Sequence, residues 1–155
     1  MTIDNLKYRN AAVALALACL LSSCAAVAQQ PANRELPAFT SIDDALQAVD
    51  KVLGCEKNPT TDPIINKALD LDGHKAEYAM CSGHVQIDWF ENEDARKASY
   101  QVYADATQPV SIVTGKNWMV VDSSEALQEP PSGKNLKALA EELGAEFTAL
   151  NGPQS

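Results

Sequence analysis

The stretch Asp70-Leu-Asp72-Gly-His74 holds two carboxylates and an imidazole close together, and these groups could bind a divalent cation. An EF-hand loop places carboxylates at positions 1, 3 and 5, glycine at position 6 and glutamate at position 12, whereas glycine stands here at position 4. A turn between two elements explains Asp and Gly equally well. We therefore expect no metal and no cofactor.

Catalytic motifs are missing from the sequence. It contains no G-x-S-x-G, H-E-x-x-H, P-loop or G-x-G-x-x-G pattern. His74 and His84 are the only histidines, and His84 and Asp88 would share one strand face with the wrong spacing for a tight contact. The sequence therefore predicts a protein that is not an enzyme. The alternative is an enzyme or metal-binding protein with an unfamiliar site around Asp70, Asp72 and His74.

Two tryptophans are the candidates for a partner surface. Trp89 lies in DWFENED, residues 88–94, where aromatic residues stand beside acids, and Trp118 follows a tight turn. An exposed aromatic residue with an acidic rim is typical of an interface anchor. The alternative places the aromatic residues in the core and the acids at the start of a helix, and the period-2 alternation of the strand favours this alternative.

The N-terminal 23 residues have the composition of a secretory signal peptide. Residues 1–10 are polar and include Lys7 and Arg9, and residues 11–21, AAVALALACLL, form an unbroken apolar run. That run is too short to span a bilayer, which needs about 20 residues in a helix. A basic start, a short apolar run and small residues after it indicate a cleaved export signal, and a retained signal anchor is the weaker alternative.

The sequence LSSC at residues 21–24 resembles the lipobox of bacterial lipoproteins, with Leu21 at position −3 and two serines before Cys24. In that family the cysteine thiol carries diacylglycerol with fatty acids such as palmitate, and the signal is cut in front of the cysteine. The resemblance implies a signal peptide over residues 1–23, lipidation of Cys24 and stable attachment to a membrane, since two or more acyl chains suffice for that. Cleavage after Ala28 instead would give a secreted protein.

Cys55 and Cys81 remain in the body of the chain once Cys19 is removed with the signal and Cys24 carries lipid. A pair of cysteines in an exported domain predicts a disulfide. A redox or metal pair is the alternative, but the chain has no C-x-x-C motif.

Composition divides the rest of the chain into three parts. Residues 24–38 are small and polar with two prolines, which predicts a flexible tether; residues 39–150 have the length of a single α+β domain; and we expect residues 151–155 to be a disordered tail. The net charge of −9 repels phosphate backbones and argues against nucleic acid as a partner.

Apolar periodicity predicts three helices and two hairpins. The helices cover residues 40–54, 92–106 and 132–150, and the hairpins cover residues 75–90, turning at Ser82-Gly83, and 110–123, turning at Gly115-Lys116. Residues 56–73 contain Pro59 and Pro63 and remain without an assigned element. The predicted fold class is α+β, with an antiparallel sheet of two hairpins, helices packed on one face and the order α-ββ-α-ββ-α.

The arrangement of VLGC at the end of a helix, a second cysteine, VQIDWF and IVTGKNWMVV is similar to that of small actinobacterial secreted lipoproteins of unknown function. The resemblance covers about residues 40–122 and implies no activity. We expect a lipid-anchored protein on the extracytoplasmic face of the cell membrane that binds an unidentified protein or small-molecule ligand. A secreted inhibitor whose acidic surface meets a basic partner is a further alternative.

Overall fold

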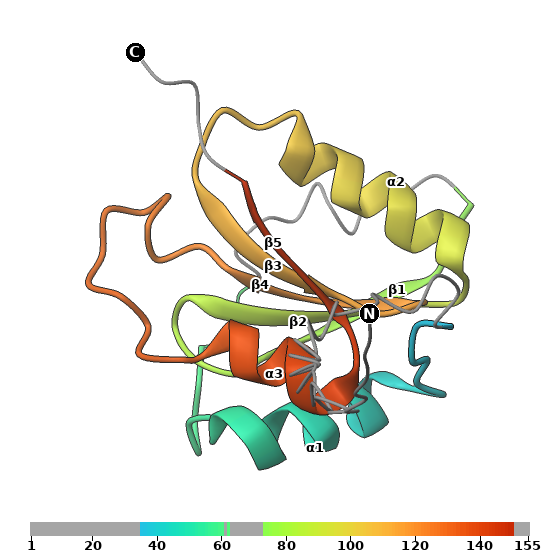
Figure 1. Cartoon of the computed structure of the whole chain (residues 1–155), viewed down its shortest axis with the longest axis horizontal. Helices are drawn as coiled ribbons and strands as arrows, with labels where there is room; N and C mark the ends of the chain where they lie inside the picture. The colour runs from blue at the N-terminus through green and yellow to red at the C-terminus, as the bar shows by residue number, and fades with distance from the viewer. Residues whose placement is uncertain (1–34, 61, 63–72, 151–155) are drawn as a thin grey trace, which may run out of the picture. The chain divides into compact units, whose positions relative to one another are not determined.

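The computed structural model describes residues 35–60, 62 and 73–150, all of which lie in the compact unit Asn33–Ser155 (Figure 1). Its elements, in chain order, are α1 (Ile42–Leu53), β1 (Ala76–Met80), β2 (Val85–Phe90), α2 (Glu93–Ala104), β3 (Val110–Thr114), β4 (Trp118–Asp122), α3 (Leu136–Leu143) and β5 (Glu146–Leu150). The α+β class and the antiparallel sheet are confirmed.

The sheet has five strands in the order β1-β2-β4-β3-β5, and every neighbouring pair is antiparallel. Both expected hairpins are present, β1 with β2 and β3 with β4, and they join where β2 pairs with β4. Their connections are longer than predicted, because residues 81–84 and 115–117 lie between the paired strands.

Helix α1 forms where the periodicity predicts it. The Ser41 hydroxyl caps its first turn by accepting a hydrogen bond from the amide N of Asp44, and Gly54 ends it in the left-handed conformation at φ 62°. Asp43 and Asp44 lie in the first turn, where the helix dipole favours negative charge. Its buried residues, Ala45 and Val49, pack toward the sheet.

The expectation that all helices cover one face of the sheet is wrong. Helices α1 and α3 pack on one face with a cluster that includes Val85, Ile87 and Trp118, whereas α2 covers the other face above Phe90 and Met119 (Figure 1). The physical reason is that β2, β3 and β4 carry buried side chains on both faces. Strands that bury both faces must be covered on both sides, and in the sequence only β4 shows this as an unbroken apolar run, WMVV.

The last predicted helix is also wrong in its second half. Helix α3 ends at Gly144, which adopts φ 66°, and the chain continues as β5. Phe147 there pairs with Val113 of β3, so the strand satisfies backbone groups along a sheet edge that would otherwise be unpaired. The sheet therefore gains a fifth strand that helical periodicity in the sequence concealed.

Candidate functional site

Residues 35–40, which we call the strap, are bound to the sheet through their backbone carbonyls. The indole Nε1 of Trp118 donates to the carbonyl of Pro37 at 2.9 Å, and the indole Nε1 of Trp89 donates to the carbonyl of Phe39 at 2.9 Å. The amide N of Lys116 also donates to Pro37 O at 2.8 Å. Two tryptophans on adjacent strands thus fix the segment that precedes α1.

Asn117, in the turn between β3 and β4, pairs with the same segment in both directions. Its Oδ1 accepts from the amide N of Phe39 at 3.0 Å, and its Nδ2 donates to the carbonyl of Phe39 at 2.9 Å and to the carbonyl of Phe90 at 3.1 Å. A side-chain amide can serve as donor and acceptor at once, so Asn117 substitutes for a neighbouring strand.

An ion pair lies at the beginning of the strap. Lys116 Nζ is 2.6 Å from Glu35 Oε1. The hydrogen bond and the charge of Lys116 lower the pKa of Glu35, and the same contact raises the pKa of Lys116. Both side chains are solvent-exposed enough that the pair contributes little to stability.

Gly115 makes room for the Trp118 indole. A Cβ at Gly115 would overlap the Trp118 ring and the Pro37 carbonyl, so only glycine fits this turn. Trp118 is fully buried and also contacts the ring of Phe39, with ring centroids 5.1 Å apart. This corrects the interpretation of Trp118 as partner surface: the indole is a core group that holds the strap. Trp89 is half-buried and holds the same segment.

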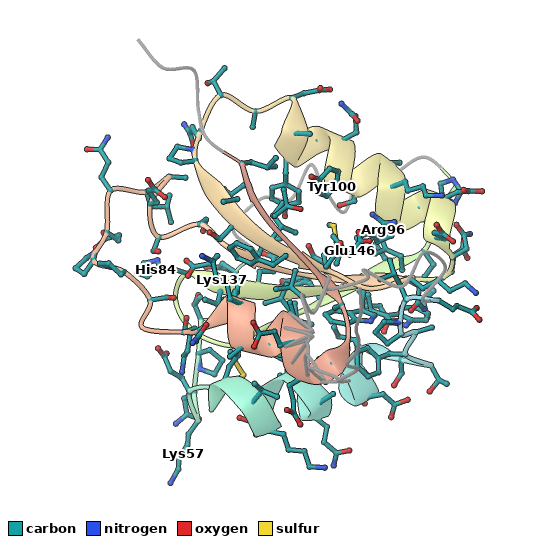
Figure 2. All side chains as sticks on the ribbon, in the orientation of Figure 1. Lys57, His84, Arg96, Tyr100, Lys137 and Glu146 are labelled. Carbon is teal, nitrogen blue, oxygen red and sulfur yellow. A yellow bond between two sulfur atoms is a disulfide. The ribbon has the colours of Figure 1, made fainter. Side chains whose placement is uncertain are left out.

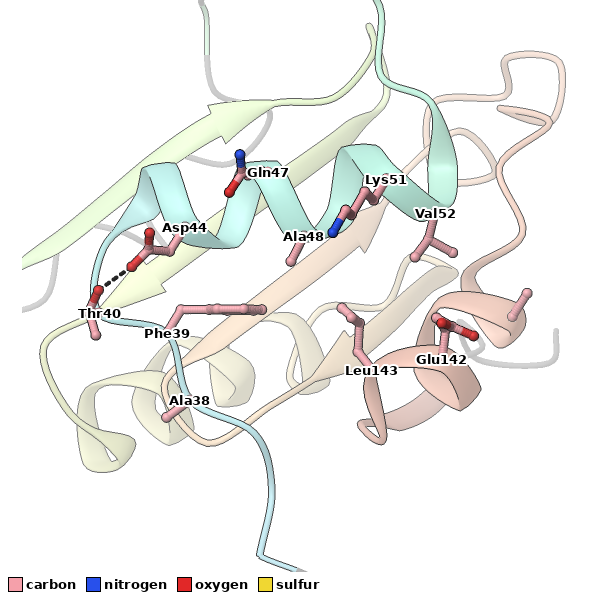
Figure 3. Close-up of a pocket in the computed structure, with 11 residues that line it drawn as sticks. Ala38, Phe39, Thr40, Asp44, Gln47, Ala48, Lys51, Val52, Glu142 and Leu143 are labelled. Carbon is pink, nitrogen blue, oxygen red and sulfur yellow. Dashed lines mark hydrogen bonds between the residues drawn. The ribbon is translucent and has the colours of Figure 1, made fainter.

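A groove lies between the strap, α1 and α3, with a volume of about 780 Å³ (Figure 3). Its half-buried apolar lining comes from all three segments: Phe39, Ala48, Val52, Ala138 and Leu143. Its exposed polar rim comprises Asp44, Gln47, Lys51 and Glu142. The volume is within the range of ligand pockets, about 300–1,000 Å³. The groove can therefore accept apolar groups that carry a polar or charged end.

A second feature is a buried carboxyl group on the opposite face of the sheet. Asp88 is fully buried, and its oxygens accept from Gln86 Nε2 at 2.6 Å and from the hydroxyl of Tyr103 at 3.5 Å. Burial raises the pKa of Asp88 to about 7, against the two hydrogen bonds, which lower it. Burial and the neighbouring Asp88 carboxylate also raise the pKa of Tyr103.

The underside of α2 carries further buried polar groups. Ser99 is fully buried and Arg96 nearly so, and neither Ser99 Oγ nor Arg96 Nε forms a hydrogen bond with any residue that the structure describes. Figure 2 shows Arg96 and Tyr100 on the side of α2 that faces the sheet. This face of the helix combines aromatic packing with polar groups that lack partners.

The disulfide between Cys55 and Cys81 is confirmed. It joins the residue after the α1 cap to the connection between β1 and β2, and the amide N of Glu56 donates to the carbonyl of Cys81 at 2.8 Å beside it. The covalent link thus fixes α1, one wall of the groove, to the sheet.

The other chemical candidates are not brought together. His74 Nδ1 lies 3.3 Å from Glu91 Oε1 in an exposed pair. Asp70 and Asp72 lie outside the described residues. The proposed lipid site, Cys24, also lies outside them. Within residues 35–60, 62 and 73–150, no three acidic, histidine or cysteine side chains form a metal-binding group. Asp88 accepts a hydrogen bond from Gln86, two residues along the same strand.

The sequence indicated Asp88 only as a neighbour of His84 on one strand face, and it did not indicate Gln86 or Asn117 as functional candidates. The signal for Asp88 and Gln86 was present, because they lie in VQIDWF, a strand whose second face is also apolar at Phe90. Asn117 had no local signal, since its partners lie 78 and 27 residues away.

Comparison with models of known protein families, with curated proteins and with solved structures found no match to this chain. Among the described helices, none combines the length and the apolar character needed to cross a membrane.

Proposed function

We propose that this chain is a lipid-anchored, extracytoplasmic binding module of the cell envelope, with the groove between the strap, α1 and α3 as its docking surface and no catalytic activity of its own. The groove is the observation that carries the proposal, because its apolar lining is accessible and its walls are held by Trp118, Trp89 and the Cys55–Cys81 disulfide. The signal peptide and the lipobox at Cys24 support the location.

The disulfide supports an oxidising compartment, where such bonds persist. The strap also determines where the anchor is attached to the domain. The chain that leads from Cys24 enters the folded domain at residues 35–40, so the anchor is joined to a segment that forms one wall of the groove. A docked partner would therefore lie close to the point at which the domain is tethered.

The chemistry of the groove favours a protein segment that carries apolar side chains followed by a basic residue. Ala48 and Ala138 are small, which lets the backbone of a partner approach both helices. Two of the three charged rim residues, Asp44 and Glu142, are acidic, and the chain has a net charge of −9. A basic side chain at one end of the segment would complement this rim.

The experiment places a photo-crosslinking residue at Gln47, on the groove rim, and at Asp94, on the exposed side of α2, in the full chain expressed in its native envelope. We expect an adduct from Gln47 that Ala48→Trp, which fills the groove, and Glu142→Lys abolish, and no such adduct from Asp94. The crosslinked segment of the partner should combine apolar and basic residues, and a synthetic peptide of that segment should bind the purified chain.

An adduct that persists after Ala48→Trp, or a crosslinked small molecule in place of a protein segment, contradicts this assignment of the groove. The location is tested separately by labelling with a radioactive fatty acid. Label should enter the wild-type chain and be lost in Cys24→Ala, and the variant should leave the membrane fraction. Retention of the label in Cys24→Ala contradicts the lipid anchor and leaves the groove assignment standing.

A further inference from the structure

Helix α2 is attached to the sheet differently from the other helices. Its buried residues are Ala95, Arg96, Ser99 and Tyr103, whereas the buried residues of α3 are Leu136, Leu139 and Ala140. Two of the four buried residues of α2 are polar, whereas all three of α3 are apolar, so polar groups make up a larger share of what α2 buries. No disulfide joins α2 to the sheet in the described part of the chain.

Polar groups at this interface oppose the packing. Asp88 has no arginine or lysine within ion-pair distance among the described residues, and a buried carboxylate without a cation is costly. Ser99 Oγ and Arg96 Nε find no partner there either. Each of these three groups would regain hydrogen bonds to water if α2 moved away.

The groups that face Asp88 come from α2, from the neighbouring strands β1 and β4, and from β2 itself. From α2, Tyr103 contacts it at 3.5 Å, and Arg96 and Ser99 share the buried side of that helix. From β1, Tyr78 is its pairing partner across the sheet, and from β4 it is Met119. Gln86 on β2 itself donates at 2.6 Å. Tyr103, Tyr78 and Arg96 are thus the titratable or charged neighbours, and burial raises the pKa of Tyr103.

We propose that α2 is a pH-dependent cover, which closes on the sheet when the Asp88 carboxyl is protonated and opens locally when it is ionised. In the closed state the protonated carboxyl stays in a dry interface. In the open state water solvates the carboxylate, and the apolar residues Phe90, Ile112 and Val121 beneath the helix become accessible. Opening of α2 would expose a second surface, on the face of the sheet opposite to the groove.

The expected pH range follows from linkage. Burial raises the pKa of Asp88 from 3.8 to about 7 in the closed state, while an exposed carboxyl keeps its ordinary value. Between these two values the opening constant of α2 increases about tenfold per pH unit, and above the upper value it stays constant. From about pH 5 to about pH 8 the constant should therefore increase about a hundredfold.

The test is amide hydrogen exchange of the full chain in detergent at about pH 5 and about pH 8, with rates corrected for the intrinsic pH dependence of exchange. Peptides from α2 should lose protection by about a hundredfold at the higher pH, while peptides from α1 and α3 keep theirs. The Asp88→Asn side chain has the size of the original and can accept the hydrogen bond from Gln86, but it carries no charge. Protection of α2 in this variant should therefore be the same at both pH values. Ser99→Ala should increase protection of α2 at both pH values and leave its pH dependence unchanged.

Equal protection of α2 at both pH values in the wild-type chain overturns the proposal, and this comparison requires no variant. A pH dependence that persists in Asp88→Asn overturns the assignment to Asp88. Loss of protection in α1, α2 and α3 together overturns local opening, because it reports unfolding of the whole domain. None of these outcomes depends on what the groove binds.

Discussion

The indole of Trp118 and the carbonyl of Pro37 form a hydrogen bond of 2.9 Å, although 81 residues separate them in the chain. The bond holds Pro37 on the centre of the sheet, so the prediction of a flexible tether over residues 24–38 is wrong for its last residues. The bond also gives a fully buried tryptophan a polar partner, which its N–H requires. The relationship therefore links the segment that precedes α1 to the core.

Trp118→Phe should loosen the strap. The phenyl ring keeps most of the apolar contact with Phe39 but cannot donate to Pro37, so we expect the free energy of unfolding to decrease by about 1–3 kcal/mol from the lost bond and the space left behind. Urea denaturation measures the change, and limited proteolysis should show faster cleavage within residues 35–40. Trp89→Phe is the control at a half-buried position, and it should decrease the free energy of unfolding by a smaller amount. Equal protease resistance of Trp118→Phe and wild type would contradict a role in holding the strap.

Gly115→Ala tests the close approach in the turn between β3 and β4. The added Cβ would overlap the Trp118 indole and the Pro37 carbonyl, so the ring or the strap has to move. We expect a loss of about 1–3 kcal/mol in the free energy of unfolding, as for other overpacked sites. Gly83→Ala is the matched control, because a Cβ there meets open space, and it should change stability by less than about 0.5 kcal/mol. Similar decreases in the free energy of unfolding for the two variants would contradict this prediction, because the added Cβ at residue 115 would then be accommodated without strain.

The disulfide should contribute a substantial part of the stability. Cys55 and Cys81 are 26 residues apart, and closing a loop of that length in the unfolded chain corresponds to about 3.5 kcal/mol in the chain-entropy model. The double variant Cys55→Ala/Cys81→Ala should lose about this amount, and a reductant should then have no further effect on it. Two free thiols at these positions in freshly purified wild-type chain, detected by mass spectrometry, would contradict the prediction.

Local features of this chain could be predicted from the sequence, and contacts between distant segments could not. The apolar stripe of α1 is encoded within one helix, so periodicity identifies it. The disulfide followed from a count of cysteines. By contrast, β5 follows a glycine that ends a helix, and its strand character depends on pairing with β3. Whether these residues form a helix or a strand therefore depends on tertiary structure, here on pairing with an open sheet edge.

The candidate site shows the same division. The sequence identified Trp89 and Trp118 as notable but assigned them to a partner surface or to the core, because nothing local indicates that their N–H groups bind the strap. The groove also depends on three segments that meet only in the fold. The placement of α2 on the second face was encoded in the apolar residues on both sides of β4, since one layer of helices cannot bury both.

Stability of the whole domain should decrease as pH increases toward neutrality. The folded-state pKa of Asp88 is raised from 3.8 to about 7, so its contribution is fully present below the unfolded value and is lost as pH increases through the folded value. The shift corresponds to at most about 4 kcal/mol, and local opening of α2 would reduce it. The lowered pKa values of Glu35 and Glu93 act in the opposite direction, but both side chains are exposed and their effects are small.

Asp88→Asn isolates this contribution, because it replaces the ionisable group with a neutral one of the same shape. Near pH 4 the variant and the wild-type chain should have similar free energies of unfolding in urea, and near pH 8 the variant should be more stable by up to about 4 kcal/mol. The wild-type chain should lose stability mainly between these two values, where the unfolded state has released a proton that the folded state retains. Parallel pH profiles for the two chains would show that the buried carboxyl does not change its ionisation on folding, and Gln86 and Tyr103 would then be sufficient partners for the charged form.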